Sequence, residues 1–67
     1  MDQYILFRFT HNCQNYFVKV KGNLNDPYRV AYVKITKRLL KLYGHYNITD
    51  VWVKRENIGW SRYYEKN

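Results

Sequence analysis

Two segments near the N-terminus alternate apolar and polar side chains with a period of two residues, which is the period of a β-strand. QYILFRFT places Ile5, Phe7 and Phe9 on one face, and NYFVKVK alternates in the same way. The polar segment HNCQ joins the two runs, which predicts an antiparallel β-hairpin. His11 and Cys13 are then expected to be ordinary residues of its loop.

The middle of the chain changes to the period of an α-helix. Asp26 and Pro27 suit the N-cap and the first helical position, and Gly44 suits the position after the last helical residue. Between them, apolar residues recur three and four positions apart. This stripe, which should face the core, consists of Tyr28, Ala31, Tyr32, Ile35, Leu39, Leu42 and Tyr43. The sequence therefore predicts a helix over residues 27–43.

Strand alternation returns after the helix. Thr49, Val51 and Val53 share one face of TDVWVKR. The segment RENIG is expected to turn the chain, because its asparagine and Gly59 both tolerate left-handed backbone. A second hairpin is therefore predicted, with its last strand ending near Tyr64.

These elements follow one another in the order β-β-α-β-β, which predicts an α+β fold in one small domain over residues 1–67. One helix covers only one face of an antiparallel sheet of about four strands, so the other face stays open. Aromatic and basic side chains alternate on that open face, while Tyr63 should turn to the core. The binding residues expected on the open face are Phe17, Lys19, Lys21, Trp52, Lys54, Trp60 and Arg62.

Composition narrows what such a face would bind. Lysine and arginine number 12 against 5 aspartate and glutamate residues, a net charge of +7, and aromatic residues make up 19% of the chain. A strongly basic protein favours polyanions. Nucleic-acid bases stack on aromatic rings while cations contact the phosphates, so Phe17, Trp52 and Trp60 are the expected stacking platforms. Binding of nucleic acid, single-stranded or directed at the backbone, is the leading hypothesis.

The predicted helix offers a second surface opposite its apolar stripe. This basic ridge consists of Lys34, Lys37, Arg38 and Lys41, with Val30, Val33 and Leu40 beside it. No acidic residue occurs in residues 27–48, so the cations have no neighbour on the helix to neutralise them. Such a surface suits an acidic groove on a protein partner or the backbone of a nucleic-acid duplex.

The size and the richness in lysine, asparagine and tyrosine are typical of proteins from AT-rich phage and plasmid genomes. The alternative hypothesis is therefore a small phage- or plasmid-type inhibitor or adaptor that docks on an acidic protein surface. Anti-CRISPR-like proteins and other blockers of host defence belong to this class. A homodimer paired through the sheet face is a third hypothesis.

The sequence does not predict an enzyme. Its 5 acidic residues are spread over a cap, a strand, a turn and the chain ends, which leaves no evident carboxylate pair for acid–base catalysis. His11 and Cys13 lack an orienting third group, and the 3 glycines are isolated from one another. No metal or other cofactor is expected.

The lone Cys13 excludes a disulfide within the chain and favours a reducing compartment. The sequence shows neither a signal-peptide pattern nor a run of about 20 apolar residues that would span a membrane. A cytoplasmic protein is therefore expected, in the host cytoplasm if a phage encodes it.

Overall fold

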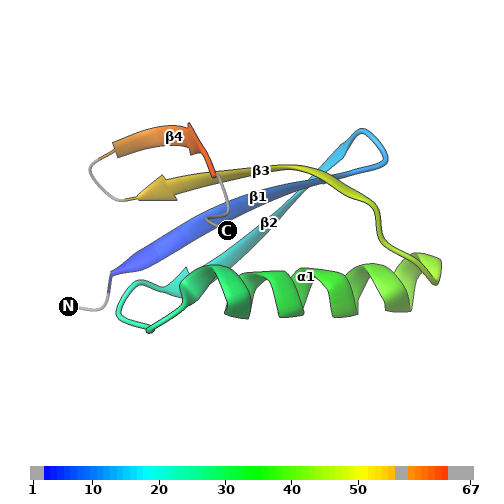
Figure 1. Cartoon of the computed structure of the whole chain (residues 1–67), viewed down its shortest axis with the longest axis horizontal. Coiled ribbons are helices and arrows are strands. Elements are labelled where there is room, and N and C mark those ends of the chain that lie inside the picture. Colours follow the sequence, from blue (N-terminus) through cyan, green and yellow to red (C-terminus); the bar gives the residue numbers. More distant parts are fainter. Residues whose placement is uncertain (1–2, 56–57, 64–67) are drawn as a thin grey trace.

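The computed structural model describes residues 3–55 and 58–63 of the chain. Its elements are β1 (Tyr4–His11), β2 (Gln14–Lys21), α1 (Pro27–Tyr43), β3 (Ile48–Arg55) and β4 (Ile58–Arg62), in that order (Figure 1). The strands form one antiparallel sheet in the order β2-β1-β3-β4, and α1 lies along one side of it. The predicted α+β fold, a β-β-α-β-β chain with one helix against a four-stranded antiparallel sheet, is confirmed.

Strand β1 lies inside the sheet, between β2 and β3, and its pairing defines both faces. Phe7 lies opposite Val18 of β2 and Val53 of β3, and Ile5 lies opposite Val20. Paired residues of neighbouring strands point to the same face, so these apolar side chains form one continuous surface. All of them are buried, and they are the residues that the period-two pattern assigned to the inner face.

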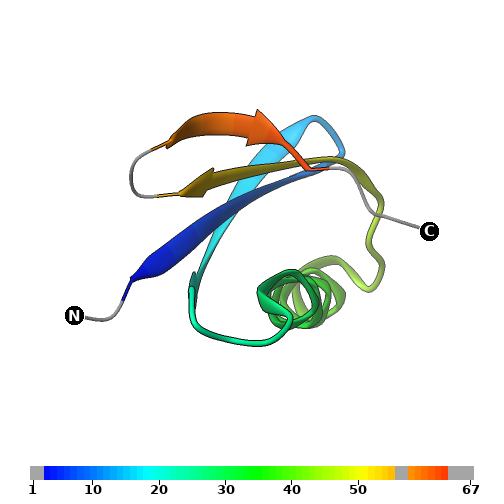
Figure 2. The same ribbon diagram turned by 60° about the vertical axis from the view of Figure 1, so that its left-hand side comes forward.

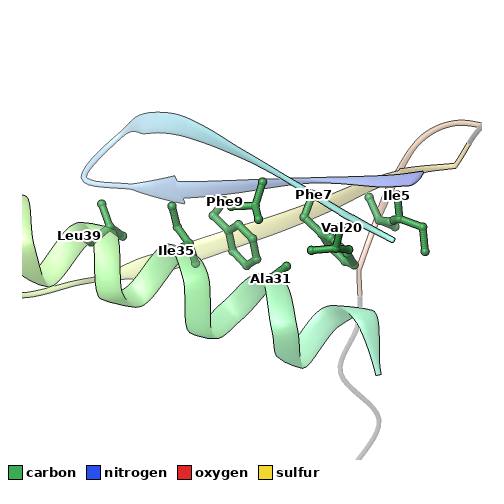
Figure 3. Packing of buried hydrophobic residues seen from close by; sticks show 9 residues of the cluster. Ile5, Phe7, Phe9, Val20, Ala31, Ile35 and Leu39 are labelled. Atoms are coloured by element: carbon green, nitrogen blue, oxygen red, sulfur yellow. The ribbon is translucent and has the colours of Figure 1, made fainter. Parts of the chain in front are cut away.

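Helix α1 covers this inner face beneath β1 and β2 (Figure 2). Phe9, Ala31, Ile35 and Leu39 have no exposed surface, and Figure 3 shows the side chains of the sheet and the helix meeting in one layer. Burial of a phenylalanine or leucine side chain contributes about 1.5–3 kcal/mol each to the stability of the fold. This cluster is therefore the main stabilising contact between the helix and the sheet.

The helix begins and ends where its capping residues predict. The Oδ1 atom of Asp26 accepts a hydrogen bond from the backbone N–H of Arg29 at 3.1 Å, and Pro27 occupies the first helical position. At the other end Gly44 adopts a left-handed conformation, with φ of 80°, and its N–H donates to the carbonyl of Leu40 at 2.9 Å. The predicted helix over residues 27–43 is confirmed.

The predicted apolar stripe is wrong in the last turn of α1. Leu42 was expected in the core but is 60% exposed. Tyr43 contacts the sheet instead, because its ring stacks on that of His11 with the ring centroids 5.2 Å apart. Successive residues of a helix point about 100° apart, so Leu42 cannot face the same way as Tyr43.

The turn between β1 and β2 is shorter than predicted. It consists of Asn12 and Cys13 alone, both with positive φ, at 49° and 67°. Positive φ at both central residues is the type I′ geometry that matches the twist of a hairpin. His11 is therefore not a loop residue, as expected from the sequence, but the buried last residue of β1.

Three details of β3 and β4 differ from the predicted pattern. The register with β1 passes from Asp50 directly to Ile48, so Thr49 is displaced by a bulge and is exposed rather than turned to the core. Gly59 lies within β4 without the left-handed backbone expected of a turn residue. Residues 56–57 of the predicted turn, and Tyr64, lie outside the described residues.

The alternation along β4 is nevertheless as predicted for Tyr63. This half-buried ring stacks on Tyr28 of α1, with the ring centroids 4.2 Å apart and the planes 8° apart. Its backbone N–H donates to the carbonyl of Val51 at 2.9 Å. Tyr63 therefore closes the core beneath β3, where the helix itself does not reach.

The hairpin turn gives a test of the backbone geometry. A left-handed conformation costs a residue other than glycine about 1–2 kcal/mol, and the Cys13 side chain is exposed. We expect Cys13→Gly to raise the free energy of unfolding by about 1 kcal/mol, measured by urea denaturation followed by circular dichroism. The control Cys13→Ser, which keeps the β-carbon, should leave stability unchanged. A Cys13→Gly variant no more stable than Cys13→Ser would contradict this account of the turn.

Candidate functional site

The outer face of the sheet, which α1 does not cover, brings the predicted binding residues together in two rows. The strand registers place the first row across β2, β1, β3 and β4 as Phe17, Arg8, Trp52 and Arg62. The second row, in the same strand order, is Lys19, Leu6, Lys54 and Trp60. Lys21 lies further along β2, opposite Tyr4. All seven sheet-face residues that the sequence predicted therefore share one surface.

Aromatic rings from three strands gather around one arginine in this surface. The guanidinium carbon of Arg8 lies 5.1 Å from the ring centroid of Trp52 and 5.2 Å from that of Trp60. The rings of Phe17 and Trp60 are 6.0 Å apart, although β1 and β3 separate their strands. These two side chains must therefore lie across the sheet, over Arg8. We call Arg8, Phe17, Trp52 and Trp60 the Arg8 cluster.

Arg8 is held by rings rather than by a carboxylate. No described acidic residue forms an ion pair with it, and its buried Nε has no hydrogen-bond acceptor among the described residues. Each cation–π contact contributes about 0.5–1 kcal/mol at an exposed site and more where water is excluded. The positive charge of Arg8 is thus fixed in position and is not neutralised by any carboxylate that the structure describes.

The rings of the Arg8 cluster differ in how much surface they offer to a ligand. Phe17 is 51% exposed and Trp60 is 36% exposed, whereas Trp52 is half-buried between its neighbours. Of the three stacking platforms expected from the sequence, Phe17 and Trp60 are therefore the accessible ones. Trp52 serves mainly to support Arg8.

The cations around the cluster are also in different states. The Nζ of Lys19 lies 4.4 Å from the ring centroid of Tyr4, which restricts the lysine. Arg62 donates from Nη2 to Oδ1 of Asp50 at 2.8 Å, an exposed ion pair that offsets part of its charge. Lys21 and Lys54 are exposed and form no ion pair with a described acidic residue. These two lysines are the most available for an anionic ligand.

Sequence reasoning did not select Arg8 as a binding residue. The alternation placed it on the open face, but its contacts depend on β1 lying between β2 and β3. That strand order puts Arg8 directly opposite both Phe17 and Trp52. A pattern read along the chain carries no such cross-strand information.

The basic ridge of α1 forms a separate surface. Lys34, Lys37, Arg38 and Lys41 are all exposed on the side of the helix that faces away from the sheet. Figure 2 shows α1 end-on, on one side of the sheet, whereas the Arg8 cluster lies on the face of the sheet that α1 does not cover. The two sets of predicted residues therefore cannot form one site.

The residues at the hairpin tip have a structural role. The Nδ1 of His11 accepts a hydrogen bond from the backbone N–H of Asn47 at 2.9 Å, and the hydroxyls of Tyr16 and Tyr43 are 2.6 Å apart. The hydrogen bond with Tyr43 raises the pKa of Tyr16 above its ordinary value, with smaller contributions from desolvation and from the charge of an ionised Tyr43. This network joins the end of α1 to the hairpin, and Cys13 remains exposed outside it.

Within the described ranges, no three or more histidine, cysteine, aspartate or glutamate side chains are arranged to hold a metal ion. The same residues include no helix with the length and apolarity needed to cross a bilayer. Comparison with protein-family models, with curated proteins and with solved structures finds no match for this chain. The function is therefore inferred from the geometry of the two surfaces.

Replacement of Arg8 tests the cluster directly. We expect Arg8→Ala to lower the free energy of unfolding by about 1–3 kcal/mol, because two cation–π contacts and the packed side-chain stem are lost. Acrylamide should then quench tryptophan fluorescence more strongly, since both tryptophans of the chain contact this arginine.

Lys21→Ala is the matched control, because it removes an exposed cation from the same face. It should change neither stability nor quenching. If Arg8→Ala behaved like this control, the rings would not depend on Arg8 for their arrangement.

Proposed function

We propose that this protein binds single-stranded nucleic acid through the outer face of its sheet. The observation that carries the proposal is the Arg8 cluster, in which two accessible rings lie beside a fixed cation that no described carboxylate neutralises. Phe17 and Trp60 stack on bases. Lys21 and Lys54 contact the phosphates on either side.

The spacing of the platforms favours a single strand over a duplex. The rings of Phe17 and Trp60 are 6.0 Å apart and tilted by 56°, whereas stacked bases in a duplex are parallel and about 3.4 Å apart. Bases that stack on both rings must be splayed away from one another. Only a flexible strand with unpaired bases allows this arrangement.

Arg8 gives the face a directional contact as well. Its guanidinium presents several N–H donors in a fixed plane, which suits a phosphate or the edge of a base. The rings already restrict this side chain, so less conformational entropy is lost when a ligand binds. The other stacking and phosphate contacts are tolerant of sequence, and we infer a weak preference among bases.

The second candidate function is the inhibitor or adaptor that docks on an acidic protein, including blockers of host defence. It is favoured by the exposed basic ridge of α1 rather than by the sheet face. Either function suits a reducing cytoplasm, where the exposed Cys13 would stay a free thiol. Pairing of two copies through the sheet face is less favourable, because it brings Arg8, Lys21 and Lys54 of both copies together.

Fluorescence titration tests the sheet face, because both tryptophans of the chain lie on it. We expect an oligothymidine of about 12 nucleotides, within the range bound by single-strand platforms, to quench tryptophan emission at low salt. Phe17→Ala should weaken binding about 5- to 150-fold, since stacking of one base contributes about 1–3 kcal/mol.

Tyr46→Ala serves as the control, because Tyr46 is also an exposed ring but packs against Tyr32 of the helix. It should bind as the unaltered protein does. Unchanged emission at low salt, or equal losses in the Phe17→Ala and Tyr46→Ala variants, would rule out stacking on this face.

Salt dependence tests which cations contact the phosphates. The logarithm of the affinity for a single strand falls with the logarithm of salt concentration by about 0.7 per phosphate contact. Lys21→Gln and Lys54→Gln should each reduce this slope by about 0.7. Lys37→Gln, on the helix ridge, should leave the slope unchanged; if it alone reduced the slope, the strand would lie on α1 instead.

A further inference from the structure

The outer face of α1 carries a line of apolar residues that the core uses only in part. Val33 and Leu40 are 42% and 47% exposed, whereas Val30 is half-buried and packs against the edge of the core. Together with Lys37, these residues are spaced three, four and three positions apart. This is the a-d-a-d spacing with which one helix packs along another. We call Val30, Val33, Lys37 and Leu40 the outer seam.

Basic residues flank the outer seam. Lys34 and Lys41 occupy the flanking e positions, Arg29 occupies a g position, and all three are exposed. The chain has no acidic residue anywhere in residues 27–49, so these charges are not neutralised within the helix. A surface of this kind combines apolar contact along a line with one sign of charge beside it.

We propose that the outer seam binds an amphipathic helix of a partner protein, whose apolar stripe is flanked by glutamate or aspartate. The apolar residues of the partner pack against Val33 and Leu40, and its carboxylates pair with Lys34 and Lys41. Lys37 interrupts the seam and selects an acidic or amide side chain opposite it. One polar residue at such a position fixes the register of the pair.

Charge excludes a second copy of the chain as the occupant. In a symmetric pair the same face would meet itself, which would bring Lys34, Lys37 and Lys41 of both copies into contact without any carboxylate. The exposed apolar residues argue against nucleic acid on this face. Phosphates gain nothing from Val33 or Leu40, whereas a protein helix buries them.

The inference does not depend on the nucleic-acid proposal. The outer seam lies on α1 and the Arg8 cluster lies on the face of the sheet that α1 does not cover, so either can be occupied without the other. The seam spans about 15 Å, or roughly three helical turns. A contact of that length is small, and we expect a dissociation constant of about 10–100 μM, typical of transient recognition.

Two labelled peptides of about three heptads provide the probes. Both carry leucine at the a and d positions; one carries glutamate at e and g, and the other carries lysine there. Fluorescence anisotropy with the full chain should show that the glutamate probe binds at least about 10-fold more tightly. Exchange of Lys34, Lys37 and Lys41 for glutamate should reverse this preference in favour of the lysine probe.

A second pair of variants separates apolar packing from charge. The double variant Val33→Ser, Leu40→Ser should bind the glutamate probe about 10-fold more weakly than the unaltered protein. The control Leu42→Ser removes a leucine of α1 that is even more exposed, at 60%, but lies outside the seam, and it should have no effect. Phe17→Ala, on the opposite face, should also bind the probe normally.

Four results would overturn the proposal. The first is that the glutamate probe does not bind at about 1 mM, and the second is that the two probes bind equally well. The third is that the double variant Val33→Ser, Leu40→Ser binds the glutamate probe as the unaltered protein does. The fourth is that duplex DNA at equal concentration displaces the probe. The last two would assign the ridge to polyanions in general. Circular dichroism of each variant confirms that α1 is intact, so loss of folding cannot imitate loss of binding.

Discussion

The structure depends on the double role of β1. As an interior strand it presents Phe7 and Phe9 to the helix, and both are almost completely buried. Between them, Arg8 points to the other face, where it meets Phe17 and Trp52 of the neighbouring strands. A slip of one residue in this strand would move Arg8 into the core. The same alternation therefore fixes the core and the candidate binding face.

In the part of the chain that the structure describes, one helix covers a sheet of four strands, and aromatic residues complete the cover. Tyr63 stacks on Tyr28 and contacts Phe7 edge-to-face, which extends the core beyond the reach of α1. Large rings bury about 150–250 Å² each, so a few of them replace a second helix. On the outer face the described residues form no such layer, and the rings pack against cations instead. The high aromatic content thus serves both sides of the sheet.

The sequence was sufficient to predict the helix and the strands, because capping residues and the spacing of apolar residues act within a few positions along the chain. Asp26, Pro27 and Gly44 marked the ends of α1, and the period-two pattern sorted most strand residues to the correct face. Contacts between distant elements were not predictable. His11 is buried because Asn47 and Tyr43 meet it from another part of the chain. The Arg8 cluster required the strand order, and Leu42 fell outside the core because Tyr43 took the contact with the sheet.

The two candidate surfaces differ in what folding alone explains. The Arg8 cluster stabilises the sheet, so its residues would be useful even without a ligand. The basic ridge contributes no comparable contact: its cations repel one another, and Val33 and Leu40 remain exposed. These features cost stability in a protein whose core is small. Because folding alone does not explain them, these features support the partner proposed for the helix face, whereas the Arg8 cluster has a structural role besides the binding proposed for it.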